Sequence, residues 1–213
     1  MNTTRNHRIG VTAVLAFTGP IAAAGLLACT SDDTTSSTPT PSSAAIATPP
    51  TGVVWRPFQG IELPVADQGP HRTEGPVAGG FDRSPAGAAL AAIHATVRLS
   101  VATDSQWAAV GQQMLAAGRG RDAWATARAQ ISITTPIAEG APKILGYQVT
   151  RYTLDATDVA VYSLHPDNSV TRNTTQVLWQ REDWRLRLPD DPTTSPVTAV
   201  PVAPADMVTF TPR

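Results

Sequence analysis

The sequence predicts a single α+β domain in which helices come first and an antiparallel sheet follows. Apolar residues recur at helical spacing after residue 84, and apolar and charged residues alternate from Trp184 to Leu188. The length of 213 residues suits one domain of ordinary size together with accessory segments. We therefore expect residues 84–213 to form the folded domain.

Residues 1–28 have the pattern of a bacterial lipoprotein signal peptide, which is removed from the mature chain. Arg5 and Arg8 give the positive start, residues 11–27 are mostly apolar, and the run ends in Leu26-Leu27-Ala28-Cys29. This ending has the lipobox pattern, although Leu27 is a less usual residue at its position. In a lipobox the cysteine thiolate accepts a diacylglyceryl group, and cleavage before it frees an amine for a further fatty acid such as palmitate.

Cys29 is the only cysteine of the chain, so no internal disulfide can form. The alternative to lipidation is an uncleaved membrane anchor with an incidental cysteine. That alternative is weakened because the apolar run is barely long enough to span a bilayer and contains Pro20. We expect a lipid-anchored protein on the outer face of the cytoplasmic membrane, where two acyl chains suffice for stable attachment.

Residues 29–52 are expected to form a disordered tether between the lipid and the domain. From Thr30 to Pro50 the chain consists of Ser, Thr, Pro, Asp and Ala, with Ile46 as the single large apolar residue. Such a segment cannot bury enough surface to offset the entropy lost on ordering.

Residues 53–83 are predicted to be an extended strap, without regular structure, that packs over the domain. Prolines interrupt the segment, and apolar side chains between them provide anchors. The prolines are Pro57, Pro64, Pro70 and Pro76, and the anchors are Trp55, Phe58, Ile61, Leu63 and Phe81. An exposed Trp55 would suit a groove for a protein partner.

Three helices are expected next. Ser84 as N-cap and Pro85 at the first helical position predict a helix over 85–101. Thr103 and Gln106 have the spacing of a capping box for a second helix, which Gly118-Arg119-Gly120 would end. Asp122 is expected to cap a short third helix.

Residues 144–188 have the composition of an antiparallel meander. Strands are expected at 144–154, 158–164, 170–180 and 184–188, because Val, Tyr, Thr and Trp are frequent there. Short turn-forming segments separate these runs, which favours pairing between successive strands. A last strand is expected at 207–211.

Helices followed by a curved meander is the element order of the NTF2-like cone fold, which residues 84–188 resemble. A second resemblance rests on the string Trp55-x-Pro57-Phe58-x-Gly60-x-x-Leu63-Pro64, then Gly69-Pro70, then Gly80-Phe81-x-x-Ser84-Pro85-x-Gly87-Ala88-x-Leu90-Ala91-Ala92. This string is similar to an uncharacterised family of actinobacterial envelope lipoproteins, whose layout resembles accessory proteins of conjugative elements. The resemblance implies a neighbourhood in a DNA-transfer or secretion apparatus and implies no catalytic residue.

The sequence contains no catalytic, cofactor-binding or metal-binding motif. There is no Gly-x-Ser-x-Gly elbow and no His-Glu-x-x-His, and neither His71 nor His165 has a second ligand at metal spacing. A formal net charge of −1 gives no basic excess for nucleic acid. The carboxylates near expected strand ends are interpreted as solvated turn charges and not as an acid–base pair. They are Asp155, Asp158, Glu182 and Asp183.

His94 and Arg98 form the candidate site within the domain. Helical spacing places His94 in the apolar stripe that faces the sheet, with Arg98 one turn further on. In a cone fold this face would look into a cavity, where His94 could bind a ligand; otherwise His94 is a hydrogen-bonded histidine at the helix–sheet seam. The sequence favours a non-enzymatic scaffold for envelope protein partners. A binding module for a small apolar ligand or cell-wall fragment is the alternative, and an isomerase-type enzyme is the third hypothesis.

Overall fold

The computed structural model describes residues 46–191 and 195–210, and the predicted α+β class is confirmed within them. Three helices are present in these residues, namely α2 (Pro85–Val101), α3 (Trp107–Met114) and α4 (Arg119–Arg128). The same residues form ten strands, which are β1 (Val54–Phe58), β2 (Ile61–Val65), β3 (Arg72–Glu74), β4 (Val77–Gly79), β5 (Lys143–Tyr152), β6 (Ala156–Leu164), β7 (Val170–Gln180), β8 (Asp183–Arg187), β9 (Val197–Val200) and β10 (Val208–Thr209). The expected signal peptide, the lipidation site Cys29 and the tether up to residue 45 lie outside the described residues.

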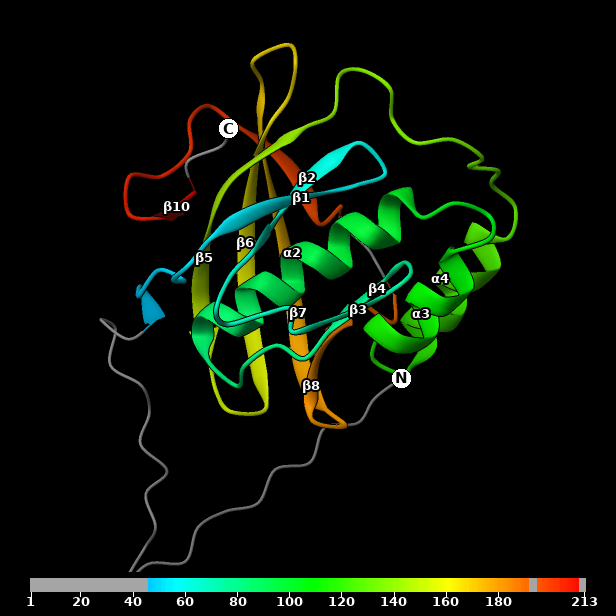
Figure 1. Cartoon of the computed structure of the whole chain (residues 1–213), viewed down its shortest axis with the longest axis horizontal. Helices are drawn as coiled ribbons and strands as arrows, with labels where there is room; N and C mark the ends of the chain where they lie inside the picture. The colour runs from blue at the N-terminus through cyan, green and yellow to red at the C-terminus, as the bar shows by residue number, and fades with distance from the viewer. Residues whose placement is uncertain (1–45, 192–194, 211–213) are drawn as a thin grey trace, which may run out of the picture. The chain divides into compact units, whose positions relative to one another are not determined.

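The strands from β5 onward form one curved antiparallel sheet (Figure 1). Its order is β10-β5-β6-β7-β8, and β9 pairs with β7 on the same edge as β8. The meander from β5 to β8 confirms the antiparallel pairing predicted from the short turns. The sequence did not predict β9, and β10 is shorter than the strand expected at 207–211.

Residues 53–83 form two β-hairpins, so the prediction of a strap without regular structure was wrong. The first hairpin turns at Gln59-Gly60, where both residues have positive φ (50° and 88°), and the second turns at Gly75-Pro76. Prolines fit the first ladder because Trp55–Pro64 and Pro57–Glu62 are opposed pairs two residues apart. In an antiparallel ladder, hydrogen-bonded and non-hydrogen-bonded pairs alternate, so pairs two residues apart are of the same kind. Proline has no N–H and therefore fits the non-hydrogen-bonded pairs.

The packed region also begins before the expected boundary at residue 53. Ile46 packs against the hydrophobic core. The Thr51 carbonyl accepts from Asp67 N (2.9 Å), and the Thr51 hydroxyl donates to the Asp67 carboxylate (2.8 Å). The last residues of the expected tether are therefore part of the fold.

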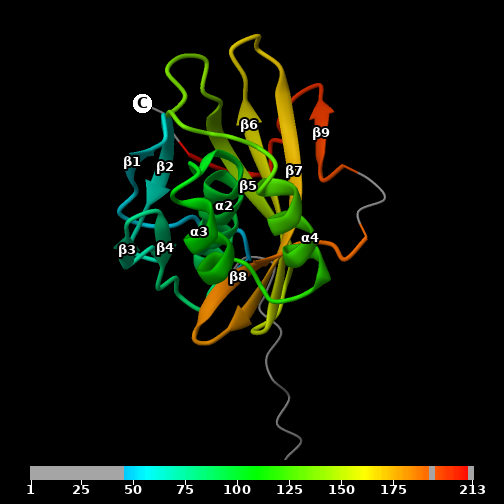
Figure 2. The ribbon, with the colours of Figure 1, turned by 90° about the vertical axis from the view of Figure 1, so that its right-hand side faces the viewer.

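Helix α2 lies between the sheet and the two hairpins (Figure 2). Residues 86–95 are consequently buried on every side of the helix. The predicted start is confirmed, because Ser84 Oγ accepts from Gly87 N (3.1 Å) and Pro85 is at the first position. Gly87 allows the incoming chain to fold back closely, since an added Cβ would collide with the Asp82 backbone.

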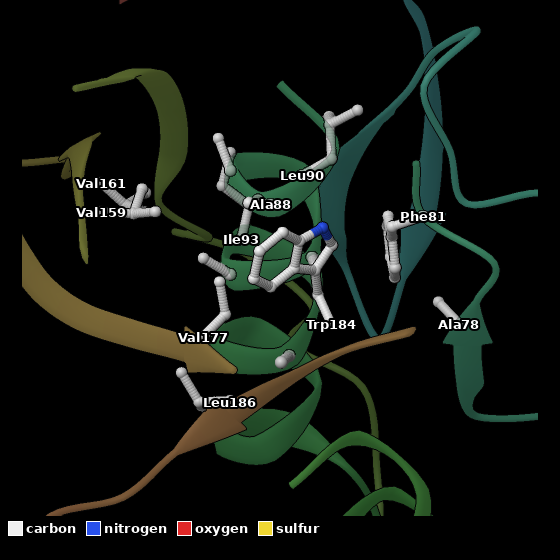
Figure 3. Packing of buried hydrophobic residues seen from close by; sticks show 14 of the residues in the cluster. Ala78, Phe81, Ala88, Leu90, Ile93, Val159, Val161, Val177, Trp184 and Leu186 are labelled. Carbon is white, nitrogen blue, oxygen red and sulfur yellow. The ribbon is translucent and has the colours of Figure 1, made fainter. Parts of the chain in front are cut away.

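The main core fills the seam between α2 and the sheet (Figure 3). Leu90 and Ile93 from α2 are fully buried there, and Trp184 and Leu186 from β8 are each 3% exposed. This confirms the predicted alternation on β8, whose arginines point to the other face. Phe81 extends the same core to the hairpin layer.

The boundaries of α3 and α4 differ from the expected ones. The Gly118-Arg119-Gly120 segment begins α4 and does not end α3, and Asp122 lies in the first turn of α4 while Gly118 is the N-cap. The reason is a tertiary contact: Gly120 packs on the backbone of residues 188–189, and its N–H donates to Asp190 Oδ1 (3.2 Å). A distant carboxylate thus replaces the local cap.

The expected capping box before α3 is half formed. Gln106 Oε1 accepts from Thr103 N (3.1 Å), whereas the Thr103 hydroxyl contacts Ser105 instead of capping the helix. The same Gln106 oxygen accepts from Gln59 Nε2 (2.9 Å) in the turn of the first hairpin. This residue therefore joins the helical layer to the hairpin layer.

Candidate functional site

His94 is enclosed between α2 and the hairpins. The prediction that His94 faces the sheet was therefore wrong. Its Nε2 donates to the carbonyl of Pro64 in β2 (2.8 Å), and its ring lies 5.7 Å from the ring of Phe81. The residue is 1% exposed. Because α2 is covered on both sides, the edge of its apolar stripe that carries His94 meets the hairpin layer.

The surroundings of His94 keep its imidazole neutral. Burial lowers the pKa from 6.5 to about 3; the hydrogen bond to Pro64 opposes this shift, and the charge of Arg98 adds to it. A group with such a pKa does not exchange protons near neutrality, where general acid–base catalysts work. His94 Nδ1 is buried without a hydrogen-bond partner among the described residues. The geometry is that of a structural donor which ties β2 to α2.

Arg98 joins both hairpins to the same helix. Its Nη1 donates to the Pro76 carbonyl in the second hairpin (2.7 Å), and its guanidinium carbon lies 4.2 Å from the ring centroid of Phe58 in the first. The residue is 5% exposed, and burial lowers its pKa to about 10, so it remains charged at neutral pH. These contacts fill the space between α2 and the hairpins beside His94 and Arg98.

Asp183 has a structural role that the sequence did not predict. It was interpreted as a solvated turn charge, but its side chain is only 13% exposed. The carboxylate accepts backbone hydrogen bonds from Gly80 (2.6 Å) and Phe81 (3.1 Å), and from its own neighbour Trp184 (2.9 Å). It holds the chain between the second hairpin and α2 against the start of β8. No local signal marks it, because the partners precede it by about a hundred residues.

Two further side chains of the sheet hold the same segment. Trp184 Nε1 donates to the Asp82 carbonyl (2.9 Å), and the Tyr152 hydroxyl donates to the Arg83 carbonyl (3.0 Å). Together with Asp183 they satisfy four consecutive residues of the chain entering α2. Buried backbone groups need such partners, so this segment is fixed by polar contacts as well as by packing.

The other carboxylates and histidines singled out in the sequence stay apart from one another. Asp155 pairs with Arg83 (2.6 Å), and Asp158 pairs with Arg151 through two bonds (2.7 and 3.1 Å). His71 contacts Asp82 (3.1 Å) and His165 contacts Thr171 (2.9 Å). Among the described residues, no group of three His, Cys, Asp or Glu side chains is placed to hold a metal ion. No helix in this part of the chain has the length and apolarity that crossing a membrane requires.

An open groove of about 630 Å³ lies between the first hairpin and the start of β5. Its lining includes Trp55, Arg56, Pro57, Glu62, Pro142 and Lys143. Trp55 is half-buried, not fully exposed, because its ring stands edge-on against Phe210 (5.7 Å, 78°). Arg56 and Lys143 are exposed. The groove combines a fixed aromatic ring with charged side chains at its rim.

These features define, within the described residues, an α+β domain in which the hairpins cover α2 and an open groove lies beside the sheet. A family model described as a domain of unknown function, DUF8175, matches residues 20–205. The match covers most of the chain, which therefore belongs to this family. No curated protein and no solved structure matches the chain.

Proposed function

We propose that this protein is a lipid-anchored, extracytoplasmic accessory or scaffold protein, and that its NTF2-like domain binds protein partners in an envelope assembly of the conjugation or secretion type. The observation that carries the proposal is the filled space beside α2. Leu90 and Ile93 of α2 are fully buried against the sheet, where Trp184 and Leu186 are each 3% exposed, so the seam where a cone fold would hold a ligand offers no room. Recognition then falls to the surface.

The groove beside the first hairpin is the surface best suited to a protein partner. Trp and Arg are the residues that most often carry binding energy at interfaces, and the groove contains Trp55 and Arg56. Trp55 is held in place by Phe210, so little side-chain entropy would be lost on binding. The hydrogen bond between Gln59 and Gln106 fixes the hairpin that forms one wall.

The proposed anchor is Cys29, on the strength of the lipobox alone. A tether of about sixteen residues, from Cys29 to the start of the packed region at Ile46, has a reach on the order of 20 Å. It would keep the domain close to the membrane, within range of membrane-embedded partners. The resemblance to accessory proteins of conjugative elements supports an assembly of that kind.

Site-specific photo-crosslinking in the producing cells tests this proposal. A photo-reactive residue in place of Arg56 should give a discrete crosslinked product, while the same residue in place of Arg172, exposed on β7, should not. Equal crosslinking from both positions, or none from Arg56, would contradict a partner groove.

A second candidate function is binding of a small apolar ligand or cell-wall fragment in the same groove. The groove volume of about 630 Å³ favours it, because ligand pockets typically measure about 300–1,000 Å³. Titration calorimetry with defined peptidoglycan fragments would separate the two functions. Saturable binding that Lys143→Glu abolishes and Arg172→Glu preserves would support the ligand over the protein partner.

A further inference from the structure

A small recess at the outer side of β8 gathers three arginines from separate parts of the chain. Arg72 comes from β3, Arg181 from the turn between β7 and β8, and Arg185 from β8 itself. The recess has a volume of about 200 Å³ and also contains Glu74 and Asp183. It lies on the face of β8 that is opposite to the core, and the groove described above does not include it.

Asp183 supplies one negative charge, which the three arginines share. Its two oxygens already accept three backbone N–H groups, at 2.6, 2.9 and 3.1 Å. Arg72 reaches the same carboxylate only at 3.5 Å, and its own side chain is 65% exposed. With Glu74, two carboxylates line the recess against three arginines, so the recess keeps a net positive charge. The other carboxylate, Glu74, is exposed and forms no ion pair with any described residue.

Arg185 is held in the recess with unused donor capacity. Its Nη1 donates to the Gln112 carbonyl (3.2 Å), but its Nε is buried without a hydrogen-bond partner among the described residues. Burial lowers the pKa of Arg185, and repulsion from Arg181 lowers it further, while Asp183 acts in the opposite direction. Arg181 and Arg185 therefore repel each other, and Asp183 offsets this repulsion only in part.

The turn that carries Arg181 keeps this residue in an unfavourable backbone conformation. Arg181 and Glu182 have φ of 54° and 60° and form a two-residue hairpin turn. Asn-Gly is the preferred sequence for such a turn, because both residues need positive φ. Arginine is not favoured in this conformation, which is consistent with a use of its side chain in the recess.

We propose that this recess binds a phosphate group, either as free phosphate or as part of a phospholipid headgroup. Guanidinium groups donate paired hydrogen bonds to such oxyanions. A tetrahedral phosphate has enough oxygens to accept from more than one arginine at a time, whereas a carboxylate has two. The recess, at about 200 Å³, is large enough for a phosphate, because it equals several times the roughly 30 Å³ that one water molecule takes up in the liquid. A bound phosphate relieves the repulsion between Arg181 and Arg185.

Thermal unfolding of the mature chain with increasing inorganic phosphate tests the site, against sodium chloride at matched ionic strength. Phosphate should raise the Tm saturably, and chloride should not. Arg181→Gly should raise the Tm in phosphate-free buffer, because glycine accepts positive φ and the repulsion disappears. The same variant should weaken the apparent phosphate affinity at least about ten-fold, which is the loss expected for one charge-assisted hydrogen bond.

Glu182→Gly is the matched control, because it relieves the same turn but keeps all three arginines. It should also raise the Tm and should retain the phosphate response. Cosedimentation with vesicles of phosphatidylglycerol and phosphatidylcholine, compared with phosphatidylcholine alone, identifies the source of the phosphate. Binding to the anionic vesicles that Arg181→Gly weakens assigns a lipid headgroup, and a response to inorganic phosphate alone assigns the free ion. Equal phosphate responses in the two glycine variants, or no response to phosphate or vesicles in the unmodified chain, would overturn the proposal. All variants carry the same anchor as the unmodified chain, and the comparison with phosphatidylcholine vesicles cancels its contribution.

Discussion

Replacing His94 by glutamine should change how the stability of the domain depends on pH. The pKa of His94 is about 3 in the folded chain and 6.5 when the chain is unfolded. Between these values the unfolded chain binds a proton that the folded chain does not, so acidification favours unfolding. The contribution is fully present above pH 6.5 and is lost progressively as the pH falls toward 3.

The expected size follows from this shift. Stability changes by at most about 1.4 kcal/mol per pH unit for one group, and by half of that at pH 6.5, so His94 alone should cost the wild type roughly 2.3 kcal/mol between pH 6.5 and 4.5. Glutamine does not titrate. At pH 7.5 His94→Gln should be less stable by about 1–3 kcal/mol because the bond to Pro64 is perturbed. By pH 4.5 that difference should vanish or reverse.

Urea unfolding followed by tryptophan fluorescence at four pH values between 7.5 and 4.5 measures the effect. Carboxylates that lose their partners in acid are shared by both proteins and cancel in the difference, and Arg98 stays charged throughout. The variant His71→Gln, at a half-exposed position, should retain the acid-sensitive slope because His94 is still present. Parallel curves for the wild type and His94→Gln would refute the buried, neutral histidine.

Three further outcomes are expected. Ile93→Ala should lower the free energy of unfolding by about 2–5 kcal/mol, measured in urea, because it empties a fully buried site between α2 and β8. Asp183→Ala should cost about 1–3 kcal/mol by leaving hairpin N–H groups unpaired, whereas Asp155→Ala, at a side chain 84% exposed, should cost less than about 1 kcal/mol. Cys29→Ser should abolish incorporation of radioactive fatty acid, and label retained in that variant would contradict the proposed anchor.

Much of the helix and sheet order could be predicted from the sequence because its signals are local. Ser84-Pro85 marks the start of α2, and the alternation around Trp184 marks the buried face of β8, as the structure confirms. Local signals failed where pairing partners decide the conformation. The first hairpin depends on Gln59 adopting a left-handed conformation, and its prolines are tolerated only because of their register with the opposite strand.

The candidate site could be predicted only in part, for a related reason. Spacing on a helix places His94 and Arg98 on one side of α2 but does not say which layer covers that side. The partners, Pro64 and Pro76, lie 30 and 22 residues upstream in a segment that the sequence showed as irregular. Asp183 was misjudged because a turn residue with a carboxylate is usually solvated, and the N–H groups it binds come from the chain just after the second hairpin.

The second layer over α2 changes what the element order can mean for function. A helix that covers a curved sheet from one side leaves its own outer face in solvent and can leave a hollow beneath. Here α2 is rich in alanine, whose small side chains let the sheet and the hairpins both approach closely, and residues 86–95 are buried as a result. A polar residue on such a helix has no solvent to meet, so it must bond to the covering layer, as His94 and Arg98 do. Proteins with this element order would then differ in function through their surfaces. In this chain the two surface features concerned are the Trp55 groove and the arginine recess.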